Sequence, residues 1–229
     1  MTDPPTAADI AGMIDHALLK PTLTDREMDA GCRTAIEYGV ASVCILPYYL
    51  GRCVELLADS DVAPSTVIGF PHGGQAMTVK FAEVERAISD GGEELDMVAN
   101  ISKALSGDWD YVEEEIRRIV EMSHAMDRRV KVIFENCYLE DEHKLRLCRI
   151  CGEAGADWVK TSTGFGSGGA EDHDLRLMRE HSPDHVQVKA SGGIRTLDRA
   201  LAVRALGCTR IGASATAAIV DEARQRFGA

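Results

Sequence analysis

The sequence predicts a single-domain α/β fold, a closed (β/α)8 TIM barrel. Short apolar runs alternate with amphipathic segments eight times along the 229 residues. Such alternation implies parallel strands joined by right-handed helical crossovers, and eight units at this length fit a closed barrel better than an open doubly wound sheet. No strand is followed by the Gly-x-Gly-x-x-Gly fingerprint of dinucleotide-binding sheets. We expect residues 1–229 to form one domain, with residues 1–12 as an N-terminal extension.

The expected strands are apolar runs that stop at prolines, glycines or small polar residues. They are Met13–Leu19, Ala41–Leu46, Ser65–Phe70, Glu94–Asn100, Val130–Glu135, the two runs that carry Lys160 and Lys189, and Thr209–Ser214. The segments between them show apolar residues at helical spacing. Thr24 and Glu27 have capping-box spacing before the first of these helices, and Gly39 is a suitable end for it. Thr196 can cap a later helix.

The net charge of -12 argues against nucleic acid or an anionic membrane as a partner, because either would need a clustered basic face. The first residues lack the basic start and apolar core of a signal peptide, and no apolar run approaches the length of a membrane span. We therefore expect a cytoplasmic protein that binds a small molecule.

The seven cysteines are odd in number and scattered, which does not indicate a disulfide framework. Cys148 and Cys151 form a C-x-x-C within an expected helix, without a second pair, and are interpreted as core or helix-face thiols. His16 and His72 lack partners at ligand spacing, so both are expected to be hydrogen-bonded histidines at strand ends. We expect no metal site.

Two lysines, Lys160 and Lys189, stand at the ends of strand-like runs. Strands of a parallel barrel are buried on both faces, so a charge inside one needs a reason. If both ammonium groups face one cavity, they repel each other and lose hydration, and both effects favour the neutral amine. A neutral lysine attacks carbonyl groups. The alternative is that each lysine extends to water or pairs with a carboxylate.

Asp96 interrupts another apolar run. Functional groups of these barrels lie at the carboxyl ends of the strands, so Asp96, Lys160 and Lys189 are expected to converge at one mouth. The set suggests Schiff-base chemistry that makes or breaks a carbon-carbon bond. Asp96 would relay protons or set the pKa values of the lysines, or it would only neutralise one of them. Lys131 begins its strand and is assigned to the bottom rim as structural.

Small residues follow the seventh and eighth strands, in Ala190–Gly193 and Gly212–Ser214. The loops after these two strands often bind phosphate in (β/α)8 barrels, because backbone N–H groups can approach an anion there. The alternative is a pair of simple tight turns that hold no ligand.

The chain resembles class I deoxyribose-phosphate aldolase over nearly its whole length. The motifs that carry the resemblance are Ile14–Pro21, Glu94–Val98, Lys131–Glu135, Val159–Phe165 and Val188–Arg195. The resemblance implies a (β/α)8 barrel that reversibly cleaves 2-deoxy-D-ribose 5-phosphate into D-glyceraldehyde 3-phosphate and acetaldehyde, in deoxyribose catabolism. It also implies an enzyme without a cofactor, commonly a homodimer.

By the same resemblance, Lys160 would form the Schiff base, Lys189 would lower its pKa and share proton transfer, and Asp96 would be the acid-base partner. Asp15 would join the proton and substrate network, and Cys44 would line the aldehyde pocket. The residues implied for the sugar phosphate are Thr163, Gly164, Gly193, Gly212 and Ser214.

Three positions depart from the family pattern. Ala17 stands where threonine is frequent, Leu46 where a polar or aromatic residue precedes the proline, and Ala215 where a second serine often follows. Each loses a possible hydrogen bond of about 1 kcal/mol. They motivate an alternative, an aldolase of the same build with a different sugar phosphate. A non-catalytic sugar-phosphate-binding barrel is disfavoured, because binding alone does not require two lysines and an aspartate at three strand ends.

Overall fold

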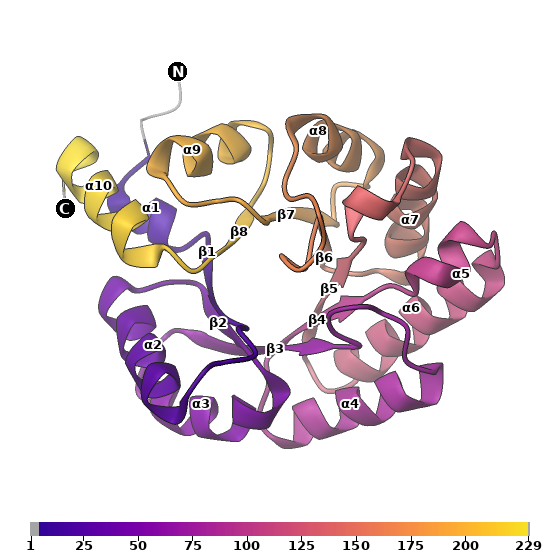
Figure 1. Cartoon of the computed structure of the whole chain (residues 1–229), viewed down its shortest axis with the longest axis horizontal. Coiled ribbons are helices and arrows are strands. Elements are labelled where there is room, and N and C mark those ends of the chain that lie inside the picture. Colours follow the sequence, from indigo (N-terminus) through magenta and orange to yellow (C-terminus); the bar gives the residue numbers. More distant parts are fainter. Residues whose placement is uncertain (1–4, 229) are drawn as a thin grey trace.

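Eight parallel strands close into a barrel in sequence order, as predicted, with β8 paired to β1 (Figure 1). The computed structural model describes residues 5–228. The strands are β1 (Ile14–Leu18), β2 (Ser42–Ile45), β3 (Ala63–Ile68), β4 (Glu94–Val98), β5 (Arg129–Ile133), β6 (Trp158–Lys160), β7 (Gln187–Ser191) and β8 (Arg210–Ala213).

Helices surround the barrel and cover its outer face (Figure 1). They are α1 (Ala7–Ala11), α2 (Asp25–Tyr38), α3 (Leu50–Leu57), α4 (Met77–Ser89), α5 (Ile101–Leu105), α6 (Trp109–His124), α7 (Asp141–Ala154), α8 (Asp172–His181), α9 (Leu197–Ala205) and α10 (Thr216–Phe227), with short 3-10 turns η1 (Pro47–Tyr49) and η2 (Asn136–Tyr138). Within the expected N-terminal extension, α1 packs against α10, and residues 1–4 lie outside the described residues.

The predicted helix ends are present. The Thr24 side chain accepts from Glu27 N while Glu27 bonds back to Thr24, and Gly39 ends α2 in the left-handed region at φ 63. Thr196 accepts from Arg199 N at the start of α9.

Most strands are a residue or two shorter than predicted, but β3 begins earlier and includes Pro64. Proline has no N–H to donate, but the carbonyl of Pro64 still accepts from Glu93 N at 2.8 Å.

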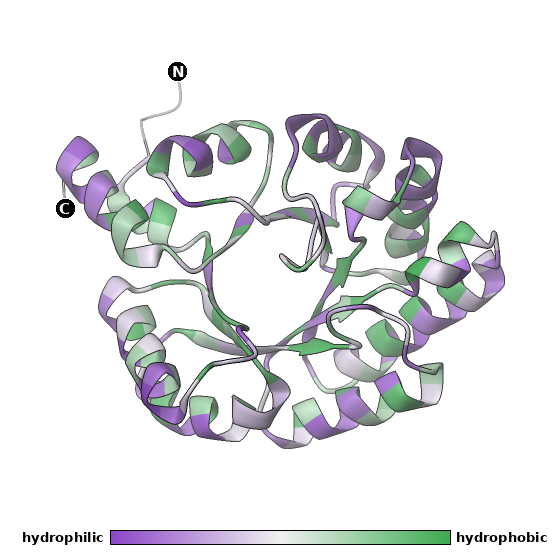
Figure 2. Ribbon diagram, viewed as in Figure 1, coloured by the Kyte–Doolittle hydropathy of each residue, from purple (hydrophilic) through white to green (hydrophobic). Residues whose placement is uncertain are grey.

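Alternate residues of each strand face opposite sides, and the two sides differ in chemistry. Many outward side chains are fully buried and apolar, as at Leu95, Val159 and Val188, and they pack under the helices. Figure 2 shows the complementary pattern on the helices, whose outward faces are hydrophilic. The inward side chains include charged groups that are at most 8 % exposed: Asp15, Glu94, Asp96, Lys131, Lys160, Lys189 and Arg210.

Cys148 and Cys151 are buried free thiols on α7, as predicted. Among residues 5–228, no helix combines the length and the apolar character that a membrane crossing requires.

Candidate active site

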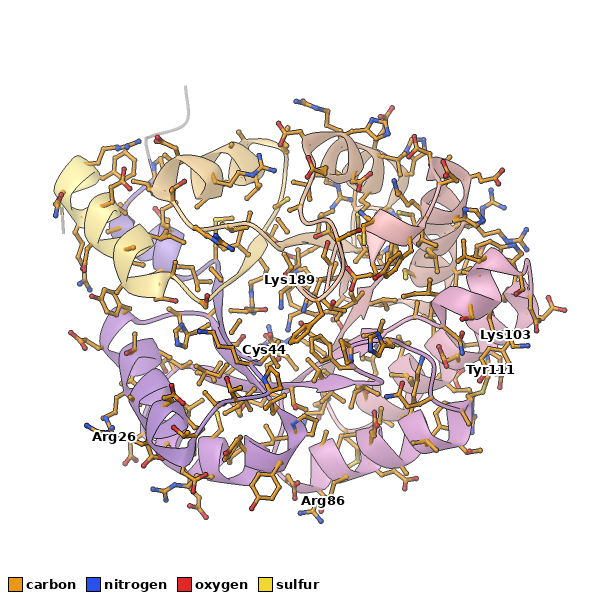
Figure 3. All side chains as sticks on the ribbon, viewed as in Figure 1. Arg26, Cys44, Arg86, Lys103, Tyr111 and Lys189 are labelled. Carbon is orange, nitrogen blue, oxygen red and sulfur yellow. The ribbon has the colours of Figure 1, made fainter. Side chains whose placement is uncertain are left out.

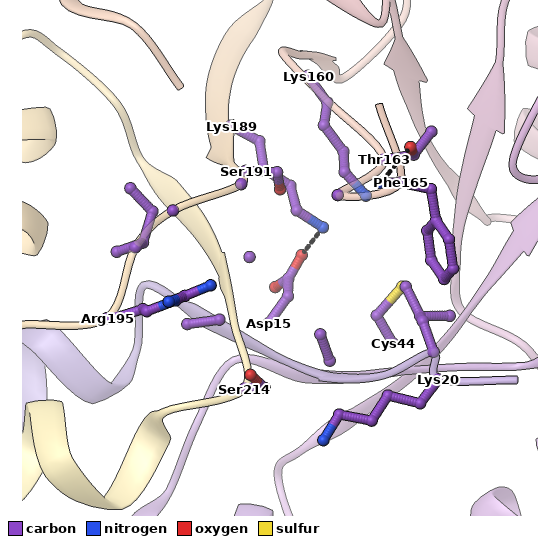
Figure 4. Close-up of a pocket in the computed structure, with 18 of the residues that line it drawn as sticks. Asp15, Lys20, Cys44, Lys160, Thr163, Phe165, Lys189, Ser191, Arg195 and Ser214 are labelled. Atoms are coloured by element: carbon purple, nitrogen blue, oxygen red, sulfur yellow. Dashed lines mark hydrogen bonds and ion pairs between the residues drawn. The ribbon is translucent and has the colours of Figure 1, made fainter. Parts of the chain in front are cut away.

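A cavity of about 380 Å³ opens at the carboxyl ends of the strands (Figure 4). Lys160 and Lys189 lie in its wall. All seven residues predicted to bind substrate line the same cavity: Asp15, Cys44, Thr163, Gly164, Gly193, Gly212 and Ser214. In Figure 3, Cys44 and Lys189 lie toward the centre of the barrel, whereas Arg26 and Arg86 lie at its periphery.

Asp96 joins the two lysines beneath this cavity. Lys160 and Lys189 are partners in the β6–β7 register, and each ammonium nitrogen lies 2.7 Å from the same oxygen, Asp96 Oδ2. Asp96 is fully buried. The predicted convergence of these three side chains is therefore confirmed.

Asp15, on β1 near the start of the chain, also contacts the lysine pair. Its Oδ2 lies 2.5 Å from Lys189 Nζ, and Figure 4 shows this ion pair (Asp15 from β1, Lys189 from β7). The predicted place of Asp15 in the network thus corresponds to a direct contact with one lysine.

The assignment of Lys131 to the bottom rim was wrong. Lys131 is fully buried in the middle of β5, with Nζ 2.8 Å from Asp96 Oδ1 and 2.6 Å from Glu94 Oε2. The strand begins at Arg129, and the register pairs Lys131 with Asp96. Lys131 therefore belongs to the charged interior. It contacts Oδ1 of Asp96, whereas Lys160 and Lys189 contact Oδ2.

Glu94 and Arg210 also belong to this interior, although neither was predicted as a site residue from the sequence. Arg210 Nη2 lies 2.7 Å from Glu94 Oε1, and Arg210 Nη1 donates to Asp15 Oδ1. Both residues stand two positions before a predicted site residue, Asp96 and Gly212 respectively. Because alternate residues of a strand share a face, this spacing is the signal that could have found them.

The interior thus holds three carboxylates and four basic side chains. Burial lowers the pKa of Lys160, and Lys189 lowers it further, although Asp96 opposes both. Burial also disfavours the charge of Lys189, but Asp15 and Asp96 outweigh it and raise the pKa of that ammonium. For Asp96, burial is outweighed by Lys131 and the lysine pair, which hold its pKa well below the usual range. Of the three lysines in this interior, only Lys160 has a lowered pKa, so the expected shift toward the neutral amine holds for Lys160 and not for Lys189.

The glycine loops after β6 and β7 pack backbone against backbone. A side chain at Gly169 would place its Cβ 2.5 Å from Gly192 O, so only glycine permits this approach. Two cations that the prediction omitted, Lys20 and Arg195, also line the cavity, and within residues 5–228 neither has a carboxylate within 4.0 Å. This end of the cavity therefore offers backbone amides and unpaired positive charge to an anion.

Thr163 lines the cavity but is engaged within the protein. Its N–H donates to Glu135 Oε1 at 3.2 Å, its hydroxyl donates to the same carboxylate, and Phe165 N donates back to that hydroxyl at 3.0 Å. Both donors of Thr163 are occupied, so a direct contact with phosphate is not supported. Thr163 instead shapes the loop that carries Gly164.

The sulfur of Cys44 lies 3.9 Å from Asp96 Oδ2. Burial raises the pKa of the thiol, which therefore stays neutral. Of the three departures from the family pattern, Ala17 lines the cavity. Leu46 packs beside Cys44, and Ala215 packs against the main core.

His16 is a hydrogen-bonded core histidine, as predicted, with Nδ1 2.7 Å from Thr216 Oγ1. Burial lowers its pKa to about 4, so it is neutral. His72 was expected to be hydrogen-bonded, but it is exposed in the loop after β3 and forms no hydrogen bond with the described residues.

One group outside the cavity has donor atoms within 4.8 Å of one another, namely Asp141, His173 and Asp174. Lys144 Nζ lies 2.7 Å from Asp174 and 3.1 Å from Asp141. One ammonium thus already pairs with both carboxylates of this cluster.

The closed barrel and the buried lysine pair at its mouth define an aldolase of the (β/α)8 type. The chain belongs to the DeoC/LacD family of aldolases, whose family model matches residues 10–219. The match covers most of the barrel, from the end of α1 into α10.

Relatives and solved structures agree with this family. A deoxyribose-phosphate aldolase from Rhodopirellula baltica is 60% identical over 96% of this chain and 91% of its own length. A deoxyribose-phosphate aldolase from Thermococcus gammatolerans is 47% identical, with 94% and 97% covered. The solved deoxyribose phosphate aldolase from Aeropyrum pernix, described as tetrameric, is 31% identical with a TM-score of 0.89, covering 95% of this chain and 92% of its own.

Replacing Asp96 by asparagine is expected to lower the free energy of unfolding by about 3 kcal/mol, because it leaves buried ammonium groups without their shared anion. The low pKa of Asp96 in the folded state means that its contribution is full above the unfolded pKa, near 4, and is lost as the pH falls below that. Urea unfolding at pH 7 and pH 3.5 should therefore show a difference that shrinks in acid.

The matched control is Asp108→Asn, which breaks the exposed Lys103–Asp108 pair at 2.6 Å. Water screens that pair, so its loss should leave the stability nearly unchanged. Equal stabilities for the wild type and Asp96→Asn at pH 7 would contradict the expected role of the buried carboxylate.

Proposed function

We propose that the protein reversibly cleaves 2-deoxy-D-ribose 5-phosphate into D-glyceraldehyde 3-phosphate and acetaldehyde through a Schiff base on Lys160. The observation that carries the proposal is the buried lysine pair on one carboxylate, with Lys160 Nζ and Lys189 Nζ each 2.7 Å from Asp96 Oδ2. Membership of the aldolase family and the names of the relatives support this substrate.

The first step forms the imine. The neutral Lys160 amine attacks the C1 aldehyde of the open-chain sugar, and the resulting carbinolamine loses water to give a protonated imine. Lys189 is charged and lies beside Asp96, so this pair can supply the proton that the departing hydroxyl needs. Asp96 can take the proton that the Lys160 nitrogen releases.

The second step breaks the C2–C3 bond. A base removes the proton of the C3 hydroxyl, the C3–O bond becomes a carbonyl, and the electrons of the C2–C3 bond move toward the iminium. The products are D-glyceraldehyde 3-phosphate and the enamine of acetaldehyde on Lys160. Asp15 and Asp96, both in contact with Lys189, are the groups through which this proton can pass.

The third step releases acetaldehyde. A proton is added to C2 of the enamine, and water hydrolyses the imine, which returns the free Lys160 amine. The same steps in reverse join the two aldehydes. Burial favours these three reaction steps, because electrostatic interactions with Asp96 and Lys189 are stronger where water is excluded.

The phosphate would lie at the end of the cavity built by Gly164, Gly193, Gly212 and Ser214. These loops follow β6, β7 and β8, where (β/α)8 barrels often hold phosphate on backbone amides. Arg195 and Lys20 would add positive charge.

A second candidate is an aldolase of the same build that acts on a different sugar phosphate. Ala17 favours it, because its methyl group lines the cavity where a threonine hydroxyl is frequent in the family. Comparison of turnover on several 3-hydroxyaldehyde phosphates separates the two candidates.

We also propose that the enzyme acts in the cytoplasm as a homodimer without a cofactor. The net charge of -12 supports a small-molecule role. The tetrameric A. pernix relative supports self-association, of which a dimer is the simplest symmetric form.

Lys160→Ala is expected to abolish cleavage of 2-deoxyribose 5-phosphate, because it removes the amine that forms the imine. Lys189→Leu should lower kcat steeply and shift the acid limb of the pH profile upward, since the loss of a neighbouring positive charge raises the pKa of Lys160. Acetaldehyde production between pH 5 and pH 9 measures both effects. Lys103→Ala, on the surface, is the control. Near-wild-type activity of Lys160→Ala would refute the mechanism.

Arg195→Met is expected to reduce kcat/KM for 2-deoxyribose 5-phosphate about tenfold, the effect of losing one charge-assisted contact to phosphate. The same change should leave the slow cleavage of unphosphorylated 2-deoxyribose unaltered. Arg204→Met, which removes an exposed arginine on α9, serves as the control. If both substrates lose activity equally, Arg195 does not act on the phosphate.

A further inference from the structure

A second layer of charge lies beneath the lysine pair, and the proposed mechanism does not use it. Arg210 Nη2 lies 2.7 Å from Glu94 Oε1, and Arg210 Nη1 lies 3.1 Å from Glu94 Oε2. The guanidinium is 5.0 Å from the centre of the Trp158 ring, which closes the layer on one side. Neither Glu94 nor Arg210 lines the cavity, so neither can touch a substrate bound there.

Two chains of ion pairs connect this layer to the proposed nucleophile. In the first, Arg210 contacts Asp15, which lies 2.5 Å from Lys189. Lys189 in turn shares the oxygen of Asp96 with Lys160. Each contact joins opposite charges, so a change at Arg210 alters the balance that Lys160 experiences.

The second chain passes through Glu94. Glu94 Oε2 lies 2.6 Å from Lys131 Nζ, and Lys131 Nζ lies 2.8 Å from Asp96 Oδ1. Arg210 holds the other oxygen of Glu94. Asp96 is thus the meeting point of both chains.

The charges in this enclosed space balance when one of its lysines is neutral. Three carboxylates, from Asp15, Glu94 and Asp96, are matched by three cations, from Lys131, Lys189 and Arg210. A fourth positive charge would leave an uncompensated buried ion, which is costly. The surplus base is Lys160, because it contacts one carboxylate, whereas Lys189 contacts two and Lys131 contacts three.

We infer that Arg210 and Glu94 are positioning residues that set the protonation state of Lys160 through the charge balance of the barrel interior. The inference rests on the proposed role of Lys160 as the imine-forming lysine. Arg210 completes the set of three cations, so Lys160 does not need to carry a proton. Glu94 orients Arg210 and Lys131 toward the other carboxylates.

The other titratable groups near Lys160 do not change this count. Cys44 is a neutral thiol, since burial raises its pKa. The carboxylate of Glu135 accepts hydrogen bonds from Thr163 and does not line the cavity. Arg129 reaches Glu94 Oε1 at 2.7 Å, but its side chain is 46% exposed and water screens it. Lys20 and Arg195 line the cavity mouth, with Lys20 exposed, and they are not part of the enclosed layer.

The sign of each substitution follows from the count. Arg210→Met removes a cation, so Lys160 retains its proton and titrates at higher pH, by about one unit for a buried charge of this kind. Glu94→Gln removes an anion and should shift the titration of Lys160 to lower pH. The double variant restores the balance and should return the titration close to that of the wild type.

The test is the pH dependence of Lys160 carbamylation by cyanate, which reacts with the neutral amine, followed by peptide mass spectrometry without substrate. The acid limb of kcat/KM should move in parallel. Arg210→Lys keeps the charge and should keep the wild-type profile even if it lowers stability. Arg129→Met, which also removes a contact to Glu94, should not shift it. Circular dichroism verifies that each variant is folded.

An unchanged Lys160 titration in folded Arg210→Met, or an equal shift in Arg129→Met, would overturn the inference. If Arg210→Met does not fold, the downward shift in Glu94→Gln decides. If Lys160 of the wild type loses its proton at a lower pH than an exposed lysine, but the protein does not turn over the sugar, only the proposed substrate is refuted. A wild-type Lys160 that titrates like an exposed lysine would refute both.

Discussion

The structure depends on a balance of charge inside a closed barrel. Three buried carboxylates face four buried basic side chains, and Asp96 contacts three of the lysines at 2.7 to 2.8 Å. An interior that excludes water tolerates such groups only when they are paired. The one lysine left over, Lys160, loses its proton most readily, and its neutral amine is the reagent that an imine requires.

The fold permits this interior because each strand carries two different faces. The outward residues, such as Leu95 and Val188, are fully buried against the helices and supply the apolar core. The inward residues are thereby free of the packing role that Val, Ile and Leu serve in most such barrels. One or two charged residues at the inward positions of six strands are enough to fill the barrel with charged groups.

The sequence predicted the fold and the centre of the site, because Asp96, Lys160 and Lys189 each interrupt an apolar run. It failed where the position of a residue depends on how the strands stagger. Lys131 and Arg210 stand near the starts of their strands and look like rim residues, yet the register places them beside Asp96 and Lys189. Thr163 was predicted from a motif, whereas its donors are taken by Glu135, a partner 28 residues away that no local pattern indicates.

The measurement that tests the central claim most directly is chemical trapping of the imine. The protein is incubated with 2-deoxyribose 5-phosphate, reduced with borohydride and digested, and the modified peptide is located by mass spectrometry. A two-carbon adduct on Lys160 is the expected result, because it records both the imine and the cleavage of the C2–C3 bond. An adduct on Lys189, or no adduct on either lysine, would contradict the assignment of Lys160 as the neutral nucleophile.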